Sequence, residues 1–362
     1  MNRRWVVATV LAVVSVVRPA AADPDPRRDR GFPRPVAAAI AVVPGAVVHG
    51  LGRYATGDTR TGHRLLLAEG LGVSAFALGG AGLLGTGASR HTVAPFAALV
   101  GLGLGTFFAT YLADVAATSL PEGTLGRAQR TLPLLEVHAG VRVLHDPTAS
   151  YGVLAVQGFD LRSGRFRVSP EASVALDDAH GRYDVGAAWR FLGPTEGRRR
   201  SQDGTFLDAE LDVLHVRAIS DRTVSTSGVL SLHGRYDLAR VGRSLAGTFA
   251  EGALGWGLQR VGYAAPAAEP DAIDVFDMRV AFGVYHGRRR APFGETKVTY
   301  DHRRDTLVGG MKVPGRAAGI LGSVGLTSRV YVTPRLGVAA EVAVGSAWMG
   351  GLSILWRPEA AP

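Results

Sequence analysis

The feature that most constrains the fold is a strict alternation in the stretch DVFDMRVAFGVYH, Asp274 to His286. Side chains of an extended strand point alternately to its two faces. One face of this stretch is apolar and carries Phe276, Met278, Val280, Phe282 and Val284. The other face carries Asp277, Arg279, Ala281 and Gly283. The pattern predicts a strand with one apolar face, which would face lipid in a membrane barrel, and one charged or small face.

The same period of two recurs from Leu134 almost to the end of the chain, which favours a closed barrel facing lipid over a soluble sandwich. Strands are predicted over Leu135–Val143, Phe166–Val174, Tyr183–Phe191, Leu207–Val213, Leu230–Tyr236, Leu254–Leu258, Phe276–Val284, Val298–Tyr300, Val324–Val330, Val338–Val342 and Trp348–Trp356. Because bacterial single-chain barrels have even strand numbers, we expect about twelve strands, with ten or fourteen as alternatives. The stretch from Thr306 to Val313 is ambiguous.

The polar faces of these strands would share one interior. The residues predicted to face the lumen are Glu136, His138, Arg142, Arg165, Arg167, Glu171, Asp184, Arg190, Asp208, Glu210, Asp212, His233, Arg235, Glu251, Asp277, Arg279, Glu295, Lys297, Asp301, Arg329 and Glu341. Both signs of charge are mixed, so a paired network that fills a narrow barrel is the first interpretation. A water-filled pore with weak charge selectivity is the second.

Aromatic residues near the predicted strand ends suggest girdles at the lipid headgroups. These residues are Tyr183, Phe191, Tyr236, Tyr263, Tyr285, Tyr300, Tyr331 and Trp356. Over Leu134 to Arg357 the chain resembles bacterial outer-membrane β-barrel proteins, by strand pattern and without a family motif. The resemblance implies an antiparallel transmembrane barrel in the outer membrane of a Gram-negative bacterium, surrounded by lipid and inserted by the barrel-assembly machinery. Many such barrels end in phenylalanine, whereas here the sequence RPEAAP follows Trp356.

The first 34 residues predict export. Arg3 and Arg4 precede the apolar run Trp5 to Val17, and small residues follow at Ala20 to Ala22. We expect a signal peptide over residues 1–22 with cleavage after Ala22, because the run is shorter than the ~20 residues that span a bilayer. Residues 23–34 form a charged, proline-containing linker.

Residues 35–118 predict an apolar helical module, followed by the barrel over residues 133–357. Gly70 to Ser89 and Thr92 to Ala113 contain no charge and are separated only by Arg90 and His91, which predicts a tight helical hairpin. The pair Gly101 and Gly105 predicts a close helix–helix contact. A buried helical pair of a soluble domain is the alternative.

The hairpin leaves two topologies open. Its high glycine and alanine content lowers the drive for insertion at the inner membrane, so that export to the outer membrane stays possible. In the competing topology, the hairpin anchors the chain in the inner membrane and the β region is periplasmic.

The segment before the hairpin contains His49 and His63 among several glycines. The spacing of the glycines does not fit a phosphate loop, because no lysine follows them. The two histidines do not fit a metal-binding helix, because they lie too far apart. We expect the glycines to permit turns between short helices, and Glu69 to cap a helix or pair with Arg64.

Composition limits the other classes of function. The 362 residues contain no cysteine, which excludes disulfides and thiolate metal sites. The net charge is +9, but arginines alternate with acids on the predicted strands, so no nucleic-acid partner is expected. No cofactor is implied, and no specific protein partner.

An outer-membrane lipid hydrolase is a further hypothesis. His138 or His233 could serve as base for Ser173 or Ser231, but no nucleophile-elbow motif accompanies them. Asp208, Glu210 and Asp212 could also bind a hard cation, yet they lie too far apart along one strand for a single ion. Pairing with inward arginines is the preferred interpretation, and no catalytic or metal-binding residue is assigned.

Overall fold

The structure is a computed structural model that describes residues 31–87, 92–120, 125–128, 132–145, 152–177, 180–195, 203–218, 223–263, 271–287, 292–303, 305–311 and 322–358. The predicted signal peptide and most of the predicted linker lie outside these residues.

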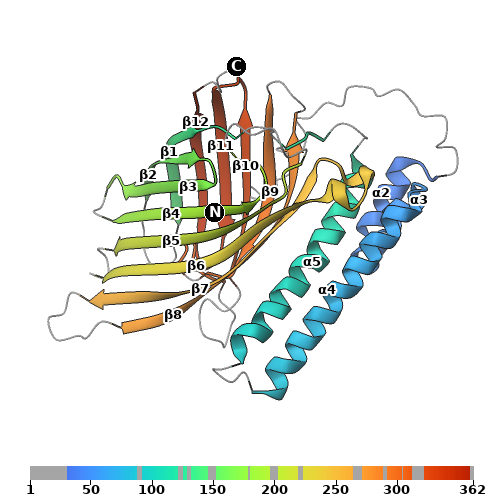
Figure 1. The fold of residues 1–362 in the computed structure, drawn as a ribbon, viewed down its shortest axis with the longest axis horizontal. Coiled ribbons are helices and arrows are strands. Elements are labelled where there is room, and N and C mark those ends of the chain that lie inside the picture. The colour runs from blue at the N-terminus through green and yellow to red at the C-terminus, as the bar shows by residue number, and fades with distance from the viewer. Residues whose placement is uncertain are drawn as a thin grey trace.

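Within the described residues, twelve antiparallel strands form a closed barrel in which each strand pairs with its neighbours in sequence, and β1 pairs with β12 (Figure 1). The strands are β1 Leu135–His145, β2 Val153–Ser163, β3 Phe166–Ala175, β4 Gly181–Leu192, β5 Phe206–Ala218, β6 Thr223–Asp237, β7 Thr248–Tyr263, β8 Asp271–His286, β9 Phe293–Asp301, β10 Ser323–Tyr331, β11 Leu336–Val344 and β12 Trp348–Trp356. We name the end at which β1 begins and β12 ends the terminal end.

The predicted fold class and strand number are confirmed, but the set of predicted stretches omitted β2. This strand carries Gln157 on its outer face, and Leu154 and Val156 on its inner face, so its alternation is weak. The ambiguous stretch after Thr306 contains no strand over its described part, residues 306–311.

The barrel is apolar outside and polar inside. Among the most exposed large side chains are Leu230, Leu258 and Ile354, each 61–63% accessible on the outer face. Asp277 and Asp208 on the inner face are buried. This distribution is the reverse of that of a soluble protein and matches a wall that separates lipid from a polar lumen.

A helical module lies against one side of the barrel, as Figure 1 shows. It consists of α2 Arg34–Val42, η1 Pro44–Ala46, α3 Leu51–Ala55, α4 Thr59–Gly85 and α5 Val93–Ser119. The antiparallel helices α4 and α5 form the predicted hairpin, and α5 contacts β8 and β7. Both long helices have the length and apolar character of membrane spans.

Glycines permit the close contacts of α5 with α4 and with the barrel, but the glycines at each contact differ from those predicted. A side chain on Gly79 or Gly103 would meet the backbone of the other hairpin helix at 2.7 or 2.5 Å. Gly101 and Gly105 instead face the barrel, where added Cβ atoms would meet Met278 at 1.7 Å and Val280 at 2.6 Å. The predicted small-residue contact is therefore between a helix and the barrel.

This contact changes the surroundings of the strand that first indicated a barrel. Met278 and Val280 do point outward, but α5 takes the place that was expected for lipid. Phe282 packs against a buried cluster that includes Leu65 of α4 and Ala113 of α5. The prediction for β8 did not include the helical cover, because alternation reports the face of a residue and not what covers that face.

A buried polar cluster joins the short helices to α5. The Asp114 carboxylate accepts backbone N–H bonds from Gly50, Gly52 and Arg53, each 3.0 Å long. Gly50 has φ 87°, and a Cβ there would lie 2.5 Å from a carbonyl oxygen, so this turn requires glycine. Glu69 accepts the backbone N–H of His49 at 2.8 Å instead of pairing with Arg64.

Candidate functional site: the barrel lumen

Three cavities follow one another through the barrel. The terminal-end cavity, about 250 Å³, is lined by residues such as Glu136, Arg162 and Tyr331. The central cavity, about 380 Å³, contains His138 and Glu171. The third cavity, about 340 Å³, reaches the opposite end of the barrel. Lys297 lines all three, so the cavities are adjacent.

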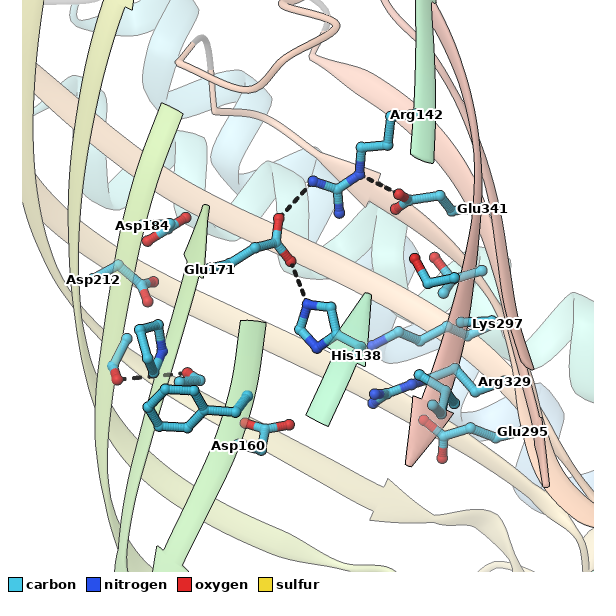
Figure 2. Close-up of a pocket in the computed structure, with 18 residues that line it drawn as sticks. His138, Arg142, Asp160, Glu171, Asp184, Asp212, Glu295, Lys297, Arg329 and Glu341 are labelled. Carbon is cyan, nitrogen blue, oxygen red and sulfur yellow. Dashed lines mark hydrogen bonds and ion pairs between the residues drawn. The ribbon is translucent and has the colours of Figure 1, made fainter. Parts of the chain in front are cut away.

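The central cavity is crossed by a network of charged hydrogen bonds (Figure 2). Glu171 on β3 accepts Nη1 of Arg142 at 2.5 Å and lies 3.2 Å from Nε2 of His138. Arg142 on β1 also donates to Glu341 on β11. Figure 2 shows these side chains meeting inside the barrel, with Lys297 across the space from Asp184 and Asp212.

A second network occupies the wall between the central and terminal-end cavities. Arg235 on β6 donates to both oxygens of Glu295 at 2.7 and 3.0 Å, and to Glu251 at 2.6 Å. Lys297 Nζ donates to the other oxygen of Glu251 at 2.8 Å. Charge-assisted bonds of this kind are the stronger hydrogen bonds in proteins, and they hold these side chains against the wall.

The three acids of β5 pair with arginines, which was the preferred interpretation of the sequence. Asp208 receives a two-pronged bond from Arg190 at 2.8 and 2.7 Å. Glu210 pairs with Arg167 and Arg279, and Asp212 lies 3.7 Å from Arg279. Each carboxylate thus has a cationic partner.

The end opposite the terminal end is narrowed by an apolar layer. Residues 305–311, in the chain between β9 and β10, fold inward there, and Val308 packs with Leu144, Leu154 and Met349. Before it, Asp305 accepts Ser227 Oγ–H at 2.9 Å, and its carbonyl accepts Arg182 Nη1 at 2.6 Å. These bonds fix the inward loop to β4 and β6.

At the terminal end, the segment that leads from α5 to β1 passes beside the mouth. The N–H groups of Gly126 and Arg127 donate to the carbonyls of Tyr285 and Gly287 at the end of β8. Arg127, Ala128, Leu132 and Pro133 then line the terminal-end cavity. The described parts of this segment therefore restrict the mouth.

Several predicted positions need correction. Arg165 lies in the turn between β2 and β3 with an exposed side chain, so it is not a wall residue of the lumen. Tyr285 and Tyr331, assigned to the aromatic girdles, point inward: Tyr331 donates to Glu136, and the Tyr285 hydroxyl lies 3.4 Å from Arg235. Both lie at odd-numbered positions that share the parity of Arg279 and Arg329, a signal that the sequence contained.

Sequence reasoning also missed charged residues of the lumen. Asp160 and Arg162 belong to the omitted strand β2, and they form an ion pair at 3.3 Å. Arg182 precedes Asp184 by two residues and could have been found by the same alternation. Arg303 and Asp305 carried no periodic signal, because they lie in the inward loop.

Carboxylates outnumber cationic groups among the described inward-facing side chains. The carboxylates are Glu136, Asp160, Glu171, Asp184, Asp208, Glu210, Asp212, Glu251, Asp277, Glu295, Asp301, Asp305 and Glu341. The cationic groups are Arg127, Arg142, Arg162, Arg167, Arg182, Arg190, Arg235, Arg279, Lys297, Arg303 and Arg329. The lumen is thus acidic, although the whole chain is basic.

The structure does not bring the candidate serine and histidine pairs together. Ser173 accepts from Arg142 at 3.0 Å, and Ser231 lies 3.4 Å from Arg279, while His138 and His233 face carboxylates. The described residues contain no group of three or more His, Cys, Asp and Glu side chains that could hold a metal ion.

No protein-family model and no curated protein matches the chain. Among solved structures it is similar to the outer-membrane protein Omp33 of Acinetobacter baumannii, with 10% identity, 64% of this chain and 100% of that chain covered, and a TM-score of 0.32. The structure of the KdgM porin in complex with disordered oligogalacturonate has 8% identity, 62% of this chain and 99% of that chain are covered, and the TM-score is 0.38. The translocator domain of the autotransporter NalP from Neisseria meningitidis has 11% identity, 62% of this chain and 88% of that chain are covered, and the TM-score is 0.36.

The class of the protein follows from the geometry of its own wall. A closed antiparallel barrel with an even number of strands, an apolar outer face and a charged lumen is the architecture of outer-membrane β-barrels. The chain has this architecture, and the outer membrane is its location.

Proposed function

We propose that the protein is a narrow pore that conducts ions and small polar solutes across the outer membrane. One observation carries the proposal: the three cavities that share Lys297 extend from the restricted mouth at the terminal end to the apolar layer at the other end. The ion pairs tie the charged side chains to one another, and the three cavities are the space that remains between them. The proposal includes export through the signal peptide and insertion by the barrel-assembly machinery.

The acidic lumen gives the proposed pore a preference for cations. Rings of carboxylates attract cations and repel anions, and close ion pairs reduce this effect without removing the excess charge. We therefore expect K⁺ to permeate better than Cl⁻ across a KCl gradient. A reversal potential of the opposite sign would contradict the assignment of the acidic lumen as the conducting path.

Planar-bilayer recording tests conduction directly. Thr327 on β10 lines both the central and the opposite-end cavity, so Thr327→Trp should place an indole between them and lower the conductance several-fold. Leu326→Trp is the matched control, because the neighbouring residue of a strand points to the other face of the barrel. If the folded wild-type protein shows no conductance steps, the pore is contradicted and a structural barrel with a filled lumen is supported.

The folded state must be established before conduction is judged. We expect the protein to fractionate with the outer membrane and to change mobility on a gel when it is boiled. Inner-membrane fractionation without this change would instead support the anchored periplasmic topology.

A further inference from the structure

The exposed face of α4 changes character sharply along the helix. Arg60, His63 and Arg64 are exposed in its first two turns. Beyond them the exposed large residues are all apolar: Leu66, Leu67, Leu71, Val73, Phe76, Leu78 and Leu84. A basic band is thus followed by an apolar face within one helical turn.

The length of this apolar face matches a bilayer. Leu66 to Leu84 spans about 27 Å at 1.5 Å per residue, and the hydrocarbon core of a bilayer is about 30 Å thick. The other side of α4 packs on α5, which itself packs on β8 and β7. The apolar face of α4 is therefore continuous with the apolar exterior of the barrel.

The basic band also includes a residue of the barrel, Arg243. Ser244, in the loop between β6 and β7, donates to Asp58 at 2.5 Å and lies 3.2 Å from the Thr61 hydroxyl, so this loop is docked on the start of α4. The exposed Arg243 is the preceding residue. Arg64 donates one N–H to the Val241 carbonyl of the same loop, so Arg60, Arg64 and Arg243 lie together at one end of the hairpin.

The neighbouring acids are turned away from this surface. Asp58 is engaged by Ser244 and by the N–H of Thr61 at 3.2 Å. Glu69 is buried and accepts from His49. The exposed charge at the start of α4 is therefore positive.

We propose that the α4–α5 hairpin is immersed in the same bilayer as the barrel, and that Arg60, Arg64 and Arg243 bind the phosphate of anionic phospholipid headgroups whose acyl chains lie along α4. Guanidinium groups bind phosphate in a two-pronged manner, and basic residues at the edge of an apolar face favour anionic lipid. The inference rests on the outer-membrane location of the proposed function and adds a lipid site to it.

Depth-dependent quenching tests the immersion. The natural chain contains no cysteine, so single cysteines can carry an environment-sensitive dye. In vesicles with doxyl-labelled lipid chains, Leu71→Cys and Leu78→Cys should be quenched as strongly as Leu230→Cys on the barrel exterior. Val332→Cys, in the turn between β10 and β11, is the aqueous reference, and we expect its quenching to be several-fold weaker.

The possible results separate the two proposals. Quenching at Leu230→Cys but not at Leu71→Cys and Leu78→Cys would overturn the immersed hairpin and leave the membrane barrel intact. Weak quenching at all three positions would overturn the membrane location, and the hairpin inference with it.

A charge-reversal pair tests the headgroup site. In vesicles of phosphatidylcholine with phosphatidylglycerol, Arg60→Glu with Arg64→Glu should lower the phosphatidylglycerol retained by the purified protein at least about tenfold. Arg217→Glu with Arg260→Glu makes the same charge change at the other end of the barrel and should retain wild-type amounts. Equal retention by the two variants, both with the wild-type gel shift on boiling, would overturn the headgroup site.

Discussion

At the residue scale, His49 is a buried ionisable group outside the membrane-spanning segments. Its Nδ1 lies 2.7 Å from the Thr110 hydroxyl, and its ring packs 4.4 Å from that of Phe107. Burial lowers the pKa of His49 below its ordinary value, and this effect outweighs the nearby charges of Glu69 and Asp114, which act to raise the pKa. The folded module therefore favours the neutral imidazole.

This pKa shift predicts a loss of stability in acid. The unfolded segment binds a proton near pH 6.5, whereas folded His49 does so only at lower pH, so the helical module should become less stable as pH falls below about 6.5. The loss should stop once pH passes the lower folded-state pKa. Labelling of a buried Ala113→Cys thiol, normalised to an exposed Thr59→Cys thiol, should accelerate several-fold between pH 7.5 and 5.5.

Two variants make this measurement specific. His49→Gln should give a flat pH profile, because the amide does not titrate. His63→Gln should keep the pH dependence, since His63 is exposed at the start of α4. A steep profile that persists in His49→Gln would assign the dependence to another group.

At the element scale, the alternation of side chains was sufficient to predict the barrel wall. Eleven of the strands overlap predicted stretches, and the inward parity of residues such as Arg142, Glu171 and Lys297 follows from the same rule. Strand β2 was missed because apolar residues occupy both of its faces at one end. Local periodicity weakens wherever the lumen itself is apolar.

Contacts between distant elements could not be predicted in the same way. The alternation of β8 cannot tell a lipid chain from α5, because both are apolar neighbours of Met278 and Val280. The inward loop around Arg303 and Asp305 has no repeating pattern, so its place in the lumen is fixed only by the folded chain. These features depend on tertiary packing and leave no local signal.

Docking of the hairpin depends on the two glycines of α5 that face the barrel. Gly105→Leu should separate α5 from β8, since a Cβ at this position already lies 2.6 Å from Val280, whose branched side chain has little freedom. A disulfide between Thr61→Cys and Ser244→Cys would report docking, because the two hydroxyls are 3.2 Å apart. We expect its yield to fall several-fold in the Gly105→Leu protein.

The matched control for this change is Gly80→Leu. No atom lies within 4 Å of a Cβ at Gly80, so the same substitution there should leave the disulfide yield unchanged. Equal yields in the two proteins would show that the contact of α5 with β8 does not hold the hairpin in place.

At the scale of the whole molecule, the apolar exterior predicts that the free-energy cost of an outward-facing charge depends strongly on its depth in the bilayer. Leu230 is the middle residue of β6 and among the most exposed on the outer face, so Leu230→Arg should destabilise the folded barrel in lipid by ~2–4 kcal/mol. Leu336→Arg, at the first residue of β11, should cost only ~0–1 kcal/mol. Reversible unfolding in denaturant in lipid vesicles measures both, and equal costs would contradict a membrane-embedded exterior.

The position of the hairpin has a consequence for assembly. The ring of strands closes where β1 meets β12, and β7 is separated from β1 by the same number of strands in both directions around the ring. Because α5 covers β8 and β7, the docked helices lie on the side of the barrel away from this seam. The hairpin therefore leaves the seam unobstructed, so the first and last strands can pair after the helices have docked on β8 and β7.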